Sequence, residues 1–168
     1  DESICLYNEL SEKYNNIGIV FQAYLKRTKN DIRKLKNGSN IRLCKGIYNE
    51  SEKVAFKDPD EINNNFLKLL EIIFQKEIYV GIATHDTKLI NLIIKLIKRM
   101  KISNNKFEFQ YLHGVPMEHM KNIYKLNKFK ARAYVPFGEN WYDYSIRRIK
   151  ENPEIATYVL KNIFFNRK

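Results

Sequence analysis

The sequence contains only two cysteines in 168 residues, Cys5 and Cys44, and their separation matches no metal-binding spacing. They support neither a zinc site nor a disulfide framework, so free thiols in a reducing compartment are expected. A run of about 18 apolar residues is also absent, and the sequence therefore predicts no membrane-spanning helix. The acidic start, residues 1–3, lacks the basic region of a signal peptide.

Acidic residues are scarce relative to basic ones. Thirty Lys and Arg stand against 19 Asp and Glu, which gives a net charge of +11. Such a charge suits nucleic acid, an anionic membrane surface or a phosphorylated cofactor. The basic residues are dispersed rather than clustered, which equally fits a chain that is rich in Lys, Asn and Ile throughout. A hydrophobic content of 44% and a charged content of 29% are typical of one globular core.

Strand-like and helix-like segments alternate along the chain. The apolar pattern predicts strands at 17–24, around 41–48, at 78–86, at 107–112 and at 131–138, with the first one buried on both faces. Helices are predicted at 4–14, 28–35, 59–73, 89–100, 117–126, 144–151 and 155–165. Thr28 is the predicted N-cap of the second helix, and Asp58-Pro59 the predicted start of the third.

This alternation predicts right-handed βαβ units and a parallel sheet. In such sheets, open or closed, ligands bind at the carboxyl ends of the strands. A closed eightfold barrel takes about 250 residues. The chain therefore holds about five strands of a (β/α)8 barrel, or else an open five-stranded sheet.

Polar residues gather where the predicted strands end, and a parallel sheet would bring them to one edge. They are Gln22, Arg42, Lys45, Thr84, His85, Gln110, His113, Tyr134 and the pair Arg147-Arg148. Lys45-Gly46 places positive charge and a close backbone approach at a strand terminus, which suits an anion or an electron-rich ring. Two neighbouring arginines suit a single carboxylate if their helix caps the site, and Glu151 is spaced to orient one of them.

Five segments in order resemble the proline dehydrogenase family. They match the patterns RLxKGxY, ATHD or ATHN, FEFQxLxG, RxYxPxG and YxxRRxxEN at 42–48, 83–86, 107–114, 132–138 and 144–152. The resemblance extends from about Ile17 to Pro153. It implies a distorted (β/α)8 TIM-like barrel that binds FAD, oxidises L-proline to Δ1-pyrroline-5-carboxylate and passes electrons to a quinone.

The resemblance also implies roles for individual residues. Gln22 would hydrogen-bond the flavin ring, and Arg42 would lie near its reactive nitrogen and stabilise the reduced, anionic ring. The other expected FAD contacts are Lys45, Gly46, Ile47, Thr84 and His85. Arg147 and Arg148 would clamp the proline carboxylate, with Glu151 orienting them. Tyr134, Leu112 and Tyr48 would shape the substrate pocket.

The chain departs from the family pattern at Cys44, where Val is usual, and at Ile47, where Ala is usual. The family's first three barrel strands, which carry a substrate-contacting lysine and an aspartate, would lie upstream of residue 1. We therefore expect residues 1–168 to be the C-terminal part of one catalytic domain, ending in a capping helix and inactive alone. The Lys/Arg-ended tail after Phe165 indicates a natural terminus nearby.

Two other functions compete with this one. A barrel aldolase would use Lys45 as a Schiff-base amine, and a binding module would use the basic, aromatic-rich surface for nucleic acid. The aldolase gives no reason for Arg147-Arg148, and the binding module would show an affinity that falls steeply with salt and survives mutation of His85. The family further implies a cytoplasmic enzyme held peripherally at the bacterial inner membrane, or a mitochondrial one.

Overall fold

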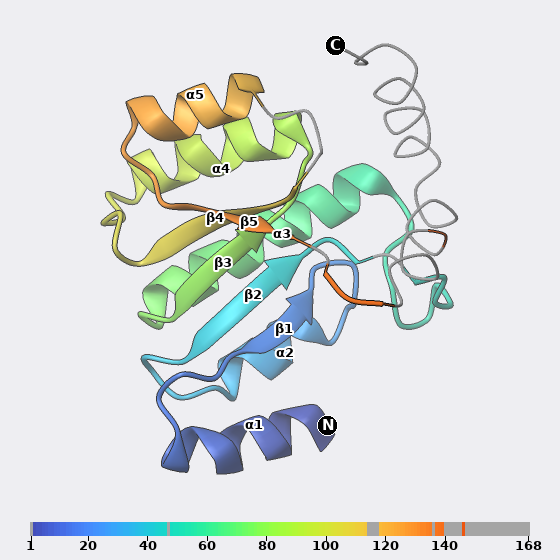
Figure 1. Cartoon of the computed structure of the whole chain (residues 1–168). Helices are drawn as coiled ribbons and strands as arrows, with labels where there is room; N and C mark the ends of the chain where they lie inside the picture. The colour runs from blue at the N-terminus through green and yellow to red at the C-terminus, as the bar shows by residue number, and fades with distance from the viewer. Residues whose placement is uncertain (1, 47, 114–117, 136, 140–145, 147–168) are drawn as a thin grey trace.

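Five strands form one parallel sheet whose spatial order follows the chain, β1-β2-β3-β4-β5 (Figure 1). The computed structural model describes residues 2–46, 48–113, 118–135, 137–139 and 146. The strands are β1 (Ile19–Gln22), β2 (Asn40–Cys44), β3 (Tyr79–Ala83), β4 (Phe107–Leu112) and β5 (Ala131–Tyr134). Consecutive order with parallel pairing is the arrangement of successive strands in a β/α barrel.

A helix precedes or links each pair of strands. The helices are α1 (Glu2–Lys13), α2 (Thr28–Arg33), α3 (Pro59–Gln75), α4 (Thr87–Arg99) and α5 (Glu118–Leu126). In Figure 1 the helices that connect the strands lie on one side of the sheet, and no helix of the described residues covers the other side. We call this second side the inner face, because it would face the interior of a closed barrel.

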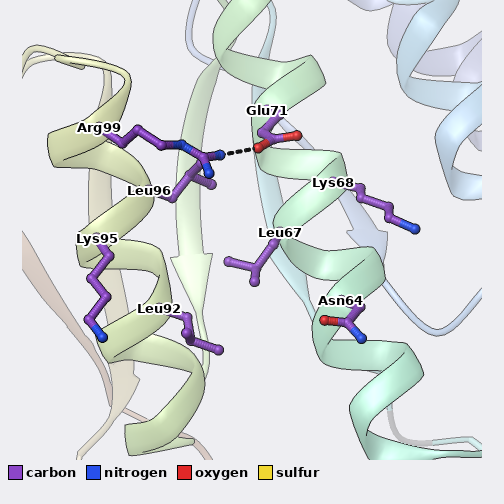
Figure 2. Close-up of a pocket in the computed structure, with 8 residues that line it drawn as sticks. All are labelled: Asn64, Leu67, Lys68, Glu71, Leu92, Lys95, Leu96 and Arg99. Carbon is purple, nitrogen blue, oxygen red and sulfur yellow. Dashed lines mark hydrogen bonds and ion pairs between the residues drawn. The ribbon is translucent and has the colours of Figure 1, made fainter.

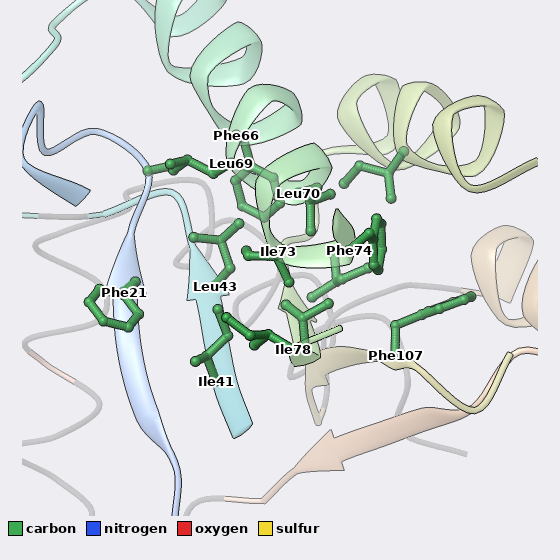
Figure 3. Packing of buried hydrophobic residues seen from close by; sticks show 14 of the residues in the cluster. Phe21, Ile41, Leu43, Phe66, Leu69, Leu70, Ile73, Phe74, Ile78 and Phe107 are labelled. Carbon is green, nitrogen blue, oxygen red and sulfur yellow. The ribbon is translucent and has the colours of Figure 1, made fainter. Parts of the chain in front are cut away.

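Helix α3 shows how the sequence builds the covered side. Asp58 caps the helix by accepting hydrogen bonds from the backbone N–H groups of Asp60 and Glu61, and Pro59 occupies the first turn. Its apolar stripe, predicted from helical spacing, is buried against the strands; the buried residues are Phe66, Leu69, Leu70, Ile73 and Phe74. Figure 3 shows these side chains in one cluster with Ile41 and Leu43 of β2, and Phe74 lies toward Phe107 of β4. Each fully buried side chain of this kind contributes about 1.5–3 kcal/mol of transfer free energy.

Strand alternation determines which side chains reach the inner face. Ile41, Leu43, Val80 and Ile82 are buried under the helices. Arg42, which alternates with them, lies on the inner face and is exposed. The strand register places inner-face residues in rows. One row holds Val20, Arg42, Gly81 and Glu108; the next holds Gln22, Cys44, Ala83, Gln110 and Arg132.

Two local predictions are wrong. Strand β1 is not buried on both faces: Phe21 packs in the core, whereas Val20 is 56% exposed because it lies on the inner face. Thr28 is not the N-cap of α2, since Arg27 occupies that position without a side-chain cap. The Thr28 hydroxyl instead donates to the carbonyl oxygen of Gln22 at 2.7 Å, which ties the helix start to the end of β1.

The α/β class, the parallel sheet and its five strands are confirmed. The predicted C-terminal capping helix lies outside the described residues. Both cysteines are free. Within the described part of the chain, no helix has the length and apolar character needed to cross a bilayer.

Candidate active site at the carboxyl ends of the strands

The segment Thr84-His85-Asp86 follows β3 directly and leads into α4. Thr84 is buried, and its Oγ1 accepts the backbone N–H of Asp86 at 3.2 Å. Asp86 caps α4 by accepting the N–H of Leu89 at 3.0 Å. This turn fixes three consecutive polar side chains at the strand end, as predicted from the switch between apolar and polar residues after Ala83.

Lys45 and Asp86 join the ends of β2 and β3. Lys45 Nζ lies 2.5 Å from Asp86 Oδ2, and both side chains are about a quarter exposed. Burial acts to raise the pKa of Asp86, but the hydrogen bonds from Lys45 and from the Leu89 N–H outweigh it and hold that pKa below its ordinary value. Lys45 is thus engaged as a donor to a carboxylate rather than presented as an open amine, which argues against the Schiff-base role.

His85 connects β3 to the end of β4. Its Nε2 accepts the backbone N–H of Leu112 at 2.9 Å. Desolvation of the covered part of the ring and the nearby positive charge of Arg42 lower the pKa of His85. Because Nε2 acts as an acceptor, the neutral imidazole carries its proton on Nδ1. His85 therefore offers one N–H donor to a ligand at the strand ends.

Arg42 presents a positive charge on the inner face. Its guanidinium lies 6.0 Å from the ring centroid of Tyr134, the last residue of β5. Among the described residues no carboxylate forms an ion pair with it. On the same strand Cys44 is half-buried, with Sγ 3.5 Å from the carbonyl oxygen of Phe21. Burial raises the pKa of the Cys44 thiol, although Arg42 acts in the opposite direction.

The other predicted site residues in the described part of the chain are Gly46, Gln22, Leu112 and Tyr48. Gly46 has φ +109°, and a Cβ there would collide with the ring of Tyr24. A glycine is thus required both for the turn out of β2 and for packing. Gln22 ends β1 in the same row as Cys44. Leu112 pairs with Tyr134 across β4 and β5, and Tyr48 is 60% exposed.

Several predicted site residues lie outside the described residues: Ile47, Arg147, Arg148 and Glu151. Of the residues expected near FAD, the structure places Gln22, Arg42, Lys45, Gly46, Thr84 and His85 on β1, β2 and β3 or directly after them. Their contacts with FAD and the expected carboxylate clamp stay predictions.

A buried carboxylate on the inner face was not singled out from the sequence. Glu108 is 5% exposed and accepts hydrogen bonds from Tyr79 Oη at 3.1 Å and Gln110 Nε2 at 2.7 Å. Arg132 binds both of its oxygens, Nε to Oε1 at 2.8 Å and a terminal nitrogen to Oε2 at 2.9 Å. A glutamate within an apolar strand is the signal that could have found it, because buried carboxylates are nearly always paired.

A separate groove of about 650 Å³ lies between α3 and α4 (Figure 2). Leu67, Leu92 and Leu96 line it, and an ion pair between Arg99 and Glu71 at 2.5 Å joins its two walls. It contains none of the predicted site residues.

Comparison with known proteins agrees with the motif pattern. The family model for proline dehydrogenase matches residues 3–160. The chain belongs to this family. Proline dehydrogenase 1 of Bacillus subtilis (strain 168) is 37% identical over 164 residues, which are 97% of this chain and 54% of that protein. Proline dehydrogenase of Deinococcus radiodurans is 32% identical over 149 residues, covering 88% of this chain and 48% of that protein. The chain thus spans about half the length of these proline dehydrogenases.

Solved structures support the fold. Proline utilization A from Bdellovibrio bacteriovorus superposes with a TM-score of 0.71 at 23% identity, over 93% of this chain and 19% of that chain. A variant of the Bradyrhizobium japonicum protein gives a TM-score of 0.72 at 22% identity, over 88% of this chain and 17% of that chain. The chain therefore has the barrel-type α/β fold of the proline dehydrogenase family, here as a five-stranded parallel sheet.

The described residues fit a flavin chemically. A flavin ring needs hydrogen-bond donors for its carbonyl oxygens and nitrogens, and positive charge where electrons accumulate. Arg42 supplies an exposed guanidinium without a carboxylate partner among the described residues, and His85 supplies the Nδ1–H fixed by Leu112. Gly46 and Gly81 have no Cβ atom, which leaves room beside the site for the ring of Tyr24 and the amide of Gln110 respectively.

Proposed function

We propose that the protein carrying this chain oxidises L-proline to Δ1-pyrroline-5-carboxylate with FAD as cofactor. The observation that carries the proposal is the family match over residues 3–160, together with the family's motif residues Arg42, in the middle of β2, and His85, just past the end of the neighbouring β3. Because the chain spans about half the length of its relatives, we further propose that residues 1–168 are the C-terminal part of one catalytic domain. The remaining barrel strands would come from the rest of that domain.

The described residues would divide the binding of FAD among them. Arg42 would place its charge beside the part of the ring that receives electrons, and Gln22 would hydrogen-bond the ring. His85 Nδ1–H, the Thr84 hydroxyl and the Lys45 ammonium would contact the rest of the cofactor, and the Gly46 backbone would pass close to it. Ile47, which lies outside the described residues, is a further contact that the family resemblance implies. Charge fixed in advance at the reacting end lowers the barrier, because the protein need not reorganise during the reaction.

Substrate binding would depend on the second half of the motif set. Arg147 and Arg148 would hold the proline carboxylate with paired N–H donors, and Glu151 would orient them. Tyr134, Leu112 and Tyr48 would enclose the ring. A fixed carboxylate positions the ring carbon that loses hydrogen, which is a contribution of orientation rather than of chemistry.

The reaction removes two hydrogens from proline. The C–H electron pair leaves as hydride and the ring nitrogen loses a proton, so a C=N bond forms. When bound, FAD would accept the hydride and later release the two electrons to an acceptor. From the family resemblance we propose a quinone as that acceptor, and peripheral contact of a cytoplasmic or mitochondrial enzyme with the membrane that holds it.

A turnover assay tests this function. The complete gene product, supplied with FAD and a soluble quinone, should convert L-proline into a product two hydrogens lighter, detected by mass spectrometry. Arg42→Met should lower kcat/KM at least tenfold, because a group that stabilises charge in the transition state contributes more than about 1.4 kcal/mol. Formation of no such product by the FAD-loaded protein would overturn the proposal.

A further inference from the structure

The side-chain amide of Gln110 is held in one orientation on the inner face. Its Nε2 donates to Oε1 of Glu108 at 2.7 Å. The amide lies over Gly81 of the neighbouring strand, where any Cβ would collide with it. Gly81 therefore provides the space that lets this side chain lie across β3.

Glu108 determines which end of the amide points outward. A carboxylate accepts hydrogen bonds and donates none, so the NH2 group of Gln110 must face it and the carbonyl oxygen must face away. Glu108 cannot readily turn, because Arg132 binds both of its oxygens and Tyr79 donates to Oε2. Three strands thus contribute to the orientation of one amide.

The carbonyl oxygen of Gln110 is an available acceptor. No donor among the described residues reaches this oxygen. It is also not one of the buried polar atoms without a partner, so the protein does not enclose it and a ligand can reach it. Gln110 shares a row with Gln22, and Gly81 beneath its amide shares a row with Arg42. The acceptor therefore lies on the same face as the proposed flavin contacts.

We propose that Gln110 accepts a hydrogen bond from an N–H group of the bound ligand, with Glu108 as the positioning residue. The inference rests on the proposed function, which supplies two such groups: the imide N–H of the flavin ring and the ammonium N–H of proline. Arg42, Lys45 and His85 Nδ1 are donors, so they cannot satisfy either group. Gln110 supplies the complementary chemistry.

The test compares Gln110→Met with Gln75→Met in the complete gene product. Gln75 lies on an exposed turn of α3, so the same chemical change occurs away from the site. Gln110→Met should weaken one ligand at least about fivefold, since a neutral hydrogen bond to the flavin imide contributes about 1 kcal/mol and one to the charged ammonium of proline contributes more. If the partner is the flavin, the dissociation constant of FAD measured by fluorescence rises; if it is proline, KM rises and FAD binding does not.

A double-mutant comparison tests the positioning role. Glu108→Gln should weaken the same ligand, and adding Gln110→Met should give little further loss because both changes remove one interaction. Two independent structural defects would instead add. Where Gln110→Met does not fold by circular dichroism, Gln110→Asn keeps the amide but shortens its reach, and Gly81→Ala displaces it; each should give the same loss.

The outcomes separate this inference from the proposed function. A wild-type protein that binds neither FAD nor proline would overturn both. A wild-type protein that binds FAD and oxidises proline, with Gln110→Met and Gln110→Asn indistinguishable from Gln75→Met, would overturn the role of Gln110 alone.

Discussion

The guanidinium of Arg42 lies 6.0 Å from the ring centroid of Tyr134, although two strands separate β2 from β5. In a flat sheet their backbones would be about 14 Å apart. The two long side chains reach across the inner face and bring the first and last of the described motifs together. The positive charge that we propose for the cofactor and the aromatic wall that we propose for the substrate thus meet at one place.

This contact predicts the behaviour of two variants at residue 134. Tyr134→Phe keeps the ring and should change kcat/KM less than twofold, whereas Tyr134→Leu should lower it about fivefold. The larger loss corresponds to about 1 kcal/mol, the value of a cation–π contact at an exposed site. Steady-state kinetics of the complete gene product measure both. Equal effects of the two variants would show that the ring does not position Arg42.

The ion pair between Lys45 and Asp86 predicts an effect on cofactor affinity. Asp86→Asn keeps the cap of α4 but removes the negative charge that occupies Lys45. An anionic cofactor such as FAD should then bind about twofold more tightly, as expected for a partly exposed pair. Asp60→Asn is the matched control, since it makes the same change of charge at an exposed position of α3. Weaker FAD binding to Asp86→Asn would mean that Asp86 orients Lys45 rather than neutralising it.

The Glu108 cluster predicts a difference in stability between two arginine variants. Arg132→Met removes the two hydrogen bonds that Arg132 donates to the buried Glu108 carboxylate and should lower the free energy of unfolding by about 2 kcal/mol. Arg99→Met removes an ion pair at the surface and should cost less than about 0.5 kcal/mol. Urea denaturation of the complete gene product compares them. An equal cost would contradict the view that Arg132 stabilises a buried charge.

His85 predicts a dependence of stability on pH. Its pKa in the folded protein lies below the ordinary value of 6.5, so as the pH falls the unfolded chain takes up the proton first. Protonating the half-covered imidazole beside Arg42 is unfavourable in the folded protein, so stability is full above about pH 6.5 and declines below it.

The comparison is urea denaturation at pH 7.5 and pH 5.5. His85→Asn should reduce the loss of stability between the two pH values, while His113→Asn, a change at another exposed histidine, should leave it intact. A loss that is unchanged in His85→Asn would assign the effect to other groups.

The sequence predicts most of the fold because its strongest signals are local. Asp58-Pro59 and the apolar stripe after it specify α3, and the predicted strand at 107–112 matches β4. The errors at Val20 and Thr28 have a long-range cause. The exposure of Val20 depends on which face of the sheet the helices cover. The Thr28 hydroxyl donates a hydrogen bond to the carbonyl oxygen of Gln22 at the end of β1, a contact with another element of the fold.

The site was predicted through its motifs rather than its geometry. The motifs named Arg42, Lys45 and His85 as candidate site residues. The pairing of Lys45 with Asp86, 41 residues apart in the chain, depends on two strands meeting. The cluster around Glu108 likewise joins β3, β4 and β5. Such contacts follow from register, which a single sequence does not reveal.

An anaerobic titration of the complete gene product tests the central proposal most directly. The purified protein, loaded with FAD, is followed by visible absorption while L-proline is added. We expect flavin bands that bleach in proportion to bound cofactor, and much less bleaching in Arg42→Met. A protein that takes up no FAD, or whose flavin bands persist at saturating L-proline, would contradict the account.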